Sequence, residues 1–265
     1  MPLLHIVVLA LVQGITEFLP ISSSAHLVLV PALTGWPDQG LVIDVATHVG
    51  TLVAVSVYFR GDLAAMLYGF ARLATGRSGP GSRLALQVLV ASLPIFAAGA
   101  ALHAVGTDVV RSVEVIAWTT LVFGLALGAA DRYSMAVRRV EHVTYLDALL
   151  VGLAQAVALI PGTSRSGITM TAGRLLGLER EEAARLSLLL SIPAILGAGA
   201  LAGWDLYRAR DLALGLDALW AAALSFAAAL VAIAAMMRWL RRASFAPFVV
   251  YRILLAAGLF YWLYA

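Results

Sequence analysis

The chain has 265 residues, of which 62% are apolar and only 12% charged, and its mean hydropathy is +0.93. A soluble domain carries about a quarter charged residues, so this composition excludes both a water-soluble globule and a disordered chain. The net charge is +3, all 18 basic residues are arginine and cysteine is absent, which excludes disulfides and thiolate metal sites. Arginines spread over short loops suit the headgroups of membrane lipids and indicate no nucleic acid partner.

The first apolar region, residues 3–35, is interrupted by Pro20-Ile21-Ser22-Ser23-Ser24. Three uninterrupted stretches follow, at 41–59, 84–106 and 113–130. A second broken region, 143–178, is interrupted by Pro161-Gly162-Thr163-Ser164-Arg165-Ser166-Gly167. Three more uninterrupted stretches complete the chain, at 186–203, 217–237 and 246–264.

Each of the six uninterrupted stretches has at least 18 residues, close to the roughly 20 that a transmembrane helix needs. Irregular backbone at membrane depth is tolerated only inside protein or beside a wet cavity. We therefore expect an all-α polytopic membrane protein, one integral membrane domain over residues 1–265, with six transmembrane helices and two re-entrant helical hairpins.

The arginine distribution sets the orientation. Loops 60–83, 131–142 and 238–242 are rich in arginine and are predicted to be cytoplasmic, whereas loops 104–112 and 204–217 are predicted to be outside. Threading the chain through these positions makes the two broken hairpins enter from opposite faces. That layout predicts an inverted-topology repeat with a midplane site, its halves covering about 1–130 and 143–265.

The first hairpin concentrates polar groups near its break. They are Gln13, Glu17, Ser22, Ser23, Ser24 and His26. Gln13 and Glu17 share one helix face, and a carboxylate with an amide oxygen suits Mg²⁺ or Ca²⁺. A serine near a histidine suits nucleophile activation or proton transfer. The alternative is a helix restarting with a serine N-cap, which leaves Glu17 and His26 in apolar sequence unexplained.

The second break predicts an anion site. Its candidate binding residues are Gly162, Thr163, Ser164, Arg165 and Ser166. Glycines allow close approach of a ligand to the backbone, and hydroxyl and N–H groups at a helix start favour phosphate. The Arg165 guanidinium adds a planar fork that matches phosphate oxygens. The alternative, an arginine pointing to water, fits poorly with the apolar flanks of this segment.

Two further positions are read as structural or left open. Asp44 and His48 lie four residues apart on span 41–59 and are expected to satisfy each other near its outer end. Gln155 is as consistent with a helix–helix hydrogen bond as with a place in the site. Taken together, a carboxylate, hydroxyls and an arginine inside the membrane indicate phosphoryl transfer on an amphiphile with a phosphate head.

The two motifs resemble those of a known family. The run from Gln13-Gly14 through Glu17-Phe18-Leu19-Pro20 to Ser22-Ser23-Ser24-Ala25-His26, and the run Pro161–Gly167, are similar to the two signatures of the undecaprenyl-diphosphate phosphatases, the bacitracin-resistance family. The closing stretch from Phe245 to Arg252 and the chain length agree with this resemblance. Gln13 and Ala25 stand where many members have glutamate and glycine.

The resemblance implies hydrolysis of undecaprenyl diphosphate, a polyprenyl lipid, by a multi-pass protein of the bacterial cytoplasmic (inner) membrane whose site opens to the periplasm. It implies a divalent cation held by Glu17 with help from Gln13. Ser23 would be the nucleophile, with Ser22 second, and His26 the acid/base or phosphate acceptor. Arg165 and Ser164 would grip the diphosphate.

Alternatives from other classes remain at this point. A transporter that flips the lipid monophosphate also uses inverted repeats and broken helices. The other class of membrane lipid phosphatase has a lysine-containing first motif, and this chain contains no lysine. The close-packing small residues permit a homodimer without requiring one.

Overall fold

The computed structural model describes residues 2–37, 40–105, 112–135, 137–209 and 215–265. The predicted outer loops 104–112 and 204–217, and the end of the predicted span 84–106, include residues outside the described ones. The α-helices are α1 (Leu3–Thr16), α2 (Ser23–Thr34), α3 (Gly40–Tyr58), α4 (Arg60–Leu73), α5 (Pro80–Val105), α6 (Val113–Tyr133), α7 (Tyr145–Ala156), α8 (Arg165–Leu175), α9 (Arg180–Ala209), α10 (Leu216–Leu240) and α11 (Ala246–Tyr264). Short 3₁₀ turns occur at Val140–His142 and Val157–Leu159.

The predicted all-α membrane fold is confirmed. Within the described residues, six helices are long and apolar enough to cross a bilayer, namely α3, α5, α6, α9, α10 and α11. They correspond in order to the six predicted spans. The helices of the hairpins are shorter, and the 14 residues of α1 rise only about 21 Å against a hydrocarbon core of about 30 Å.

The structure differs from the prediction in two regions, at the start of α9 and in the predicted loop 60–83. α9 begins at Arg180, six residues before the predicted span, because Arg185 pairs with Glu182 and with Asp62 of α4 and keeps this charged turn helical. The predicted loop 60–83 mostly forms α4, which packs on α5. With 14 residues and charges at Arg60, Asp62 and Arg72, α4 is too short and too charged to be identified as a span.

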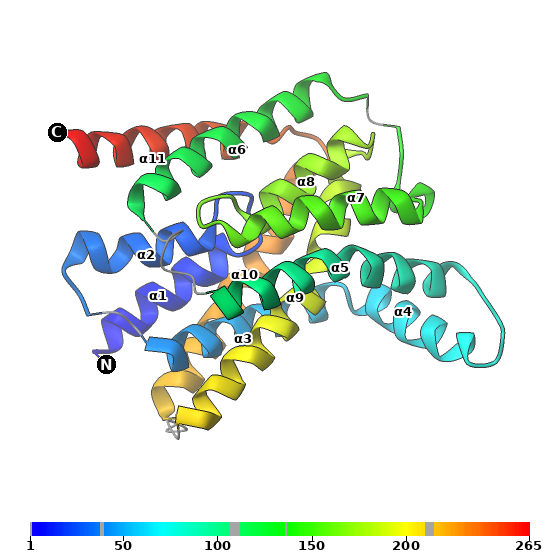
Figure 1. Ribbon diagram of the computed structural model, residues 1–265, viewed down its shortest axis with the longest axis horizontal. Coiled ribbons are helices and arrows are strands. Elements are labelled where there is room, and N and C mark those ends of the chain that lie inside the picture. The colour runs from blue at the N-terminus through cyan, green and yellow to red at the C-terminus, as the bar shows by residue number, and fades with distance from the viewer. Residues whose placement is uncertain (1, 38–39, 106–111, 136, 210–214) are drawn as a thin grey trace.

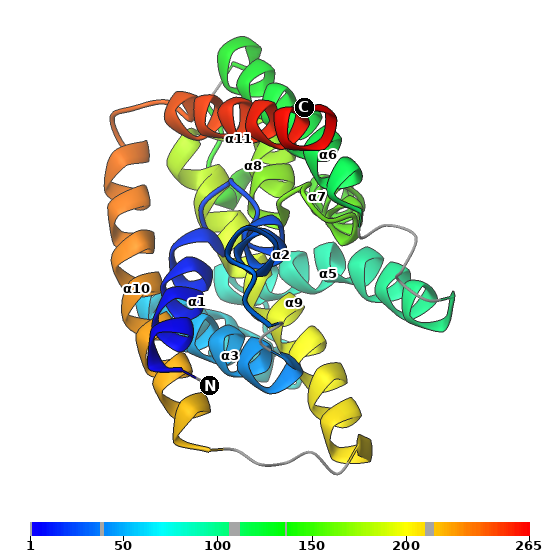
Figure 2. The same ribbon diagram turned by 90° about the vertical axis from the view of Figure 1, so that its left-hand side faces the viewer.

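The helices of each predicted half pack against spans of the other. α1 packs on α10, α7 packs on α5, and α11 runs along α6; in Figures 1 and 2 the α1–α2 and α7–α8 hairpins approach each other in the middle of the molecule. Glycines permit these approaches, because a methyl group at Gly14 or Gly152 would overlap the neighbouring backbone of α10 or α5. The inverted repeat stays a prediction. Such a repeat would produce this packing, in which helices of one half contact spans of the other.

Candidate active site

The tips of the two hairpins contact each other through charged and polar groups. The Glu17 carboxylate in the first tip lies 3.2 Å from an Arg165 guanidinium nitrogen in the second. Ser166 Oγ donates a hydrogen bond of 2.9 Å to the Leu19 carbonyl. Only 8% of the Glu17 side chain and 13% of the Arg165 side chain are exposed. The two motifs predicted from the sequence therefore lie in direct contact.

Glu17 is the centre of a hydrogen-bond network within the first tip. Ser23 Oγ donates to Glu17 Oε2 over 2.7 Å, and Gln13 Nε2 donates to the same oxygen over 3.0 Å. Glu17 Oε1 accepts from Arg165. A carboxylate at hydrogen-bond distance from a hydroxyl can take its proton when that hydroxyl attacks an electrophile.

A cavity of about 200 Å³ opens beside these groups. Its polar wall consists of Glu17, Ser22, Ser23, Ser24, His48, Ser164 and Arg165. Its apolar wall consists of Ile95, Ala158, Ala194, Ile195 and Ala198. A polar pocket of this size beside an apolar wall suits a small anionic head joined to an apolar tail.

Both tips use the same uncommon backbone conformation. Ser22 and Ser164 have φ values of 74° and 69°, in a region that costs a non-glycine residue about 1–3 kcal/mol. Ser22 Oγ lies 3.2 Å from Ser24 Oγ, and Ser164 Oγ lies 3.2 Å from Ser166 Oγ. Each strained residue immediately precedes a helix, so the N-termini of α2 and α8 are directed to the same region. Two helix N-termini favour an anion there.

Serine capping, the alternative expected for the first tip, is seen at the second tip instead. Ser164 Oγ accepts a hydrogen bond of 3.1 Å from the Gly167 N–H and so caps α8. Ser22 holds the N-cap position of α2, but its side chain makes no capping hydrogen bond. Ser22 nevertheless lines the cavity, and its hydroxyl lies 3.2 Å from that of Ser24, which also lines it.

Several predicted site residues lie behind the cavity wall. They are Gln13, His26, Gly162, Thr163 and Ser166, none of which lines the cavity. Gly162 has a φ of 86°, and a methyl group there would overlap Thr119 on α6. This glycine therefore serves the packing of the tip against α6.

His26 has partners of its own outside the cavity. Its Nδ1–H donates 2.7 Å to the Ser22 carbonyl, and its Nε2 accepts from the Tyr251 hydroxyl on α11. Its ring stacks on that of Tyr251, with centroids 5.7 Å apart. The structure thus places His26 where it holds the first tip against α11.

His48 is the cavity residue that sequence reasoning underestimated. Its Nδ1–H donates over 2.7 Å to the main-chain carbonyl oxygen of Asp44, while the expected pairing of the two side chains stays a prediction. Its Nε2 nevertheless lies 4.0 Å from Glu17 Oε2. The available signal was a histidine in the middle of an apolar span, but the sequence does not show that α3 packs beside the first tip.

The residues present fit a divalent cation that is bound together with its phosphate-bearing substrate and with water. Within the described ranges no group of three or more histidine, aspartate or glutamate side chains is arranged to hold a metal ion. Gln13 donates to Glu17 through Nε2, and its Oε1 is a buried acceptor without a hydrogen-bond partner. One carboxylate and one amide oxygen match Mg²⁺ when phosphate oxygens and water supply the remaining ligands.

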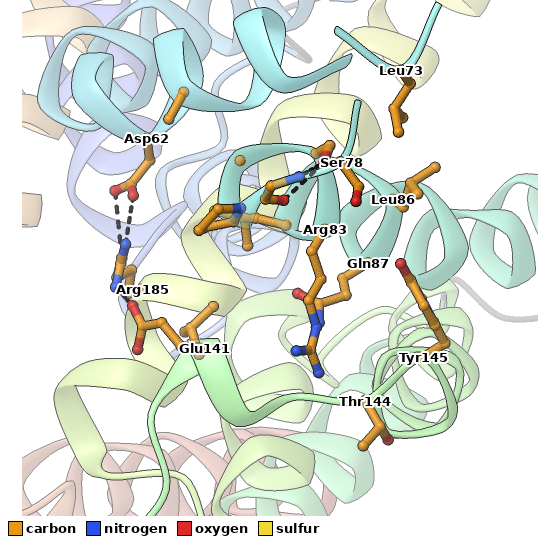
Figure 3. Close-up of a pocket in the computed structure, with 17 residues that line it drawn as sticks. Asp62, Leu73, Ser78, Arg83, Leu86, Gln87, Glu141, Thr144, Tyr145 and Arg185 are labelled. Atoms are coloured by element: carbon orange, nitrogen blue, oxygen red, sulfur yellow. Dashed lines mark hydrogen bonds and ion pairs between the residues drawn. The ribbon is translucent and has the colours of Figure 1, made fainter. Parts of the chain in front are cut away.

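A larger cavity, of about 720 Å³, lies between α4, α5 and the segment before α7 (Figure 3). It contains none of the predicted site residues. Its cations have partners already, since Arg185 pairs with Asp62 and Glu141 and Arg83 donates to the Val143 carbonyl. The two predicted motifs line only the smaller of these two cavities, which is therefore the candidate site.

Comparison with known proteins agrees with the site. Residues 6–258 match the family model described as bacitracin resistance protein BacA. The chain belongs to this family. BacA family members similar to it include undecaprenyl-diphosphatase 1 of Rhodospirillum rubrum, 55% identical over 98% of this chain and 94% of the relative. Undecaprenyl-diphosphatases of Ruegeria pomeroyi, 53% identical over 98% and 97%, and of Hahella chejuensis, 49% identical over 98% of each chain, are also similar.

Proposed function

We propose that this chain hydrolyses undecaprenyl diphosphate to undecaprenyl phosphate and inorganic phosphate, which recycles the carrier lipid of peptidoglycan synthesis and confers bacitracin resistance. Membership of the BacA family and relatives named undecaprenyl-diphosphatase support this activity. The structural observation that carries it is the contact of Ser23, Glu17 and Arg165 at one small cavity. Nucleophile, base and phosphate-binding cation are thereby present together.

In the proposed reaction Ser23 Oγ attacks the terminal phosphorus while its proton passes to Glu17 Oε2, the acceptor 2.7 Å away. The bond from the terminal phosphorus to the bridging oxygen breaks, and undecaprenyl phosphate leaves with that oxygen. A phosphate is a weak base, so its departure needs no general acid. Water then hydrolyses the phosphoserine and releases inorganic phosphate.

The second tip would bind the transferring group. Arg165 lies at the cavity with a guanidinium fork that matches phosphate oxygens. Ser22, Ser24 and Ser164 offer hydroxyl donors around the same space. The charge of the transition state lies on the phosphoryl oxygens, so these donors act where that charge develops.

A divalent cation, Mg²⁺ or Ca²⁺, would be held by Glu17 and Gln13 together with the diphosphate. Its chemistry would be to neutralise phosphate charge. Thr163 and Ser166 would shape the second tip from behind, and His26 would hold the first tip through Tyr251.

The cavity is proposed to open to the periplasm from the bacterial inner membrane. Ile95 lies fifteen residues beyond Pro80, the start of α5 next to the arginine-rich loop 60–83. That separation is about 22 Å along a helix. Ala194 and Ala198 lie fourteen and eighteen residues beyond Arg180, the charged start of α9, which is about 21 and 27 Å along a helix. These separations support an opening on the side remote from the arginines that are predicted to be cytoplasmic. A homodimer stays a prediction, and the proposed reaction needs no second copy.

The test is phosphate release from undecaprenyl diphosphate by purified protein in detergent, with Mg²⁺ or Ca²⁺ and with chelator. Cation-dependent release that is abolished in folded Glu17→Ala and Arg165→Ala proteins supports the proposal. Radiolabelled phosphate trapped on the wild type and absent from Ser23→Ala supports the phosphoserine step. No release by folded wild-type protein would contradict the activity, and lipid flipping would then be tested by labelling Ser24→Cys from each face.

A further inference from the structure

A fully buried arginine lies in the last membrane-spanning helix without a carboxylate beside it. The Arg252 residue on α11 is 0% exposed. Among the ion pairs of the described residues, Arg252 takes part in none. An unpaired cation at membrane depth is costly and is retained where it has a function.

Within the part of the chain that the structure describes, the Arg252 guanidinium donates to backbone carbonyls near the two hairpin tips. Its guanidinium has five N–H donors in a fixed planar fork. Nη1 donates to Thr163 over 3.0 Å and to Pro20 over 3.4 Å, Nη2 donates to Gly162 over 3.0 Å and to Thr119 over 3.3 Å, and Nε donates to Thr120 over 3.0 Å. One side chain thus joins the first tip, the second tip and α6.

The surrounding helices leave space for this side chain. A methyl group added at Gly124 of α6 would lie 2.9 Å from Arg252 Cβ, and one added at Gly167 of α8 would lie 2.9 Å from its Nη1. Real carbon atoms essentially never approach so closely. Glycines on two separate helices therefore leave the space that the Arg252 side chain occupies.

The carbonyls that Arg252 binds are next to the reacting side chains. Thr163 precedes Ser164 and Arg165, and Pro20 lies three residues before Ser23. Arg252 itself does not line the cavity. The contacts between Ser23, Glu17 and Arg165 depend on the relative position of two irregular loops, which have few backbone hydrogen bonds of their own.

We propose that Arg252 is a positioning residue, which holds the two hairpin tips against each other and so sets the geometry of Ser23, Glu17 and Arg165. This proposal rests on the proposed phosphatase function for its kinetic consequence. A displacement of about 1 Å at a reacting group can lower a rate by about 100-fold.

The kinetic test compares Arg252→Lys and Arg252→Met with Arg174→Lys as the control. Arg174 is equally buried and also donates to carbonyls, but it lies at the far end of α8. We expect kcat to fall about 100-fold in Arg252→Met and about tenfold in Arg252→Lys, because an ammonium retains three donors. KM should change by less than about threefold, since no substrate contact is removed. Wild-type kcat in folded Arg252→Met would overturn the proposal.

A second measurement is independent of activity. The chain has no cysteine, so Leu33→Cys on α2 and Leu153→Cys on α7, both at exposed positions, give a clean spin-label pair across the two hairpins. We expect the distance distribution to broaden or shift in Arg252→Met and to stay unchanged in Arg174→Lys. An unchanged distribution in folded Arg252→Met would refute the positioning role even if the phosphatase assay itself failed.

Discussion

The ion pair between the two hairpin tips gives the sharpest prediction about stability and activity. Glu17 and Arg165 lie 3.2 Å apart with side chains only 8% and 13% exposed. Removing one member of such a buried pair leaves an uncompensated charge, which costs about 3–5 kcal/mol. We therefore expect Glu17→Gln and Arg165→Gln each to lower the melting temperature in detergent by about 10 °C.

The double variant separates the structural role from the chemical one. With both charges removed, two amides occupy the site, and most of the lost melting temperature should return. Activity should not return, because Ser23 has lost its carboxylate acceptor and the phosphate its guanidinium. We expect phosphate release to stay at least about 1,000-fold below wild type in all three variants.

The assay is intrinsic tryptophan fluorescence during heating, with phosphate release measured on the same preparations. The chain contains six tryptophans, none of which is changed. A double variant as unstable as the worse single variant would refute the reasoning, because the two charges would then not compensate each other. Glu17→Gln with more than about a tenth of wild-type activity would refute the assignment of Glu17 as the base.

Three other outcomes are expected. Gly162→Ala should lower stability by about 2 kcal/mol or more in thermal unfolding, because its φ is 86° and a methyl group would overlap Thr119; Gly203→Ala, with open space around it, should be neutral, and equal effects would contradict the packing argument. His48→Gln should reduce kcat by less than about tenfold, because 4.0 Å from Glu17 is no hydrogen bond; a loss above about 100-fold would identify His48 as a proton-transfer group. Chelation should abolish phosphate release yet leave the melting temperature of the substrate-free protein unchanged, since the described residues hold no cluster of metal ligands; a large drop would reveal a resident structural metal.

The transmembrane helices could be predicted because the lipid environment requires long apolar segments. A helix that spans must be apolar for its whole length, so α3 and α10 follow directly from composition. The same rule identifies the two tips, since charged residues inside apolar sequence need a reason to be there. Helix α4 escaped prediction because its 14 residues, which include Arg60, Asp62 and Arg72, are too few and too charged for a span.

The site could be predicted only as far as neighbours in sequence are neighbours in space. Glu17 and Ser23 belong to one tip, and their contact follows from a single short segment. His26 was expected at the reaction because it follows Ser23 closely, whereas the structure turns it toward Tyr251. His48 and Arg252 reach the tips from other helices through packing that no local pattern reveals.

The left-handed serines show how one backbone design can serve two chemistries. Ser22 and Ser164 adopt nearly the same conformation, each followed at once by the first residue of a helix. In one tip that first residue is Ser23, and in the other it is Arg165. In both tips this turn therefore places the next residue at the wall of the shared cavity. The identity of that one residue thus decides what each tip contributes: a hydroxyl that can attack phosphorus in the first tip, and a guanidinium that can bind phosphate oxygens in the second.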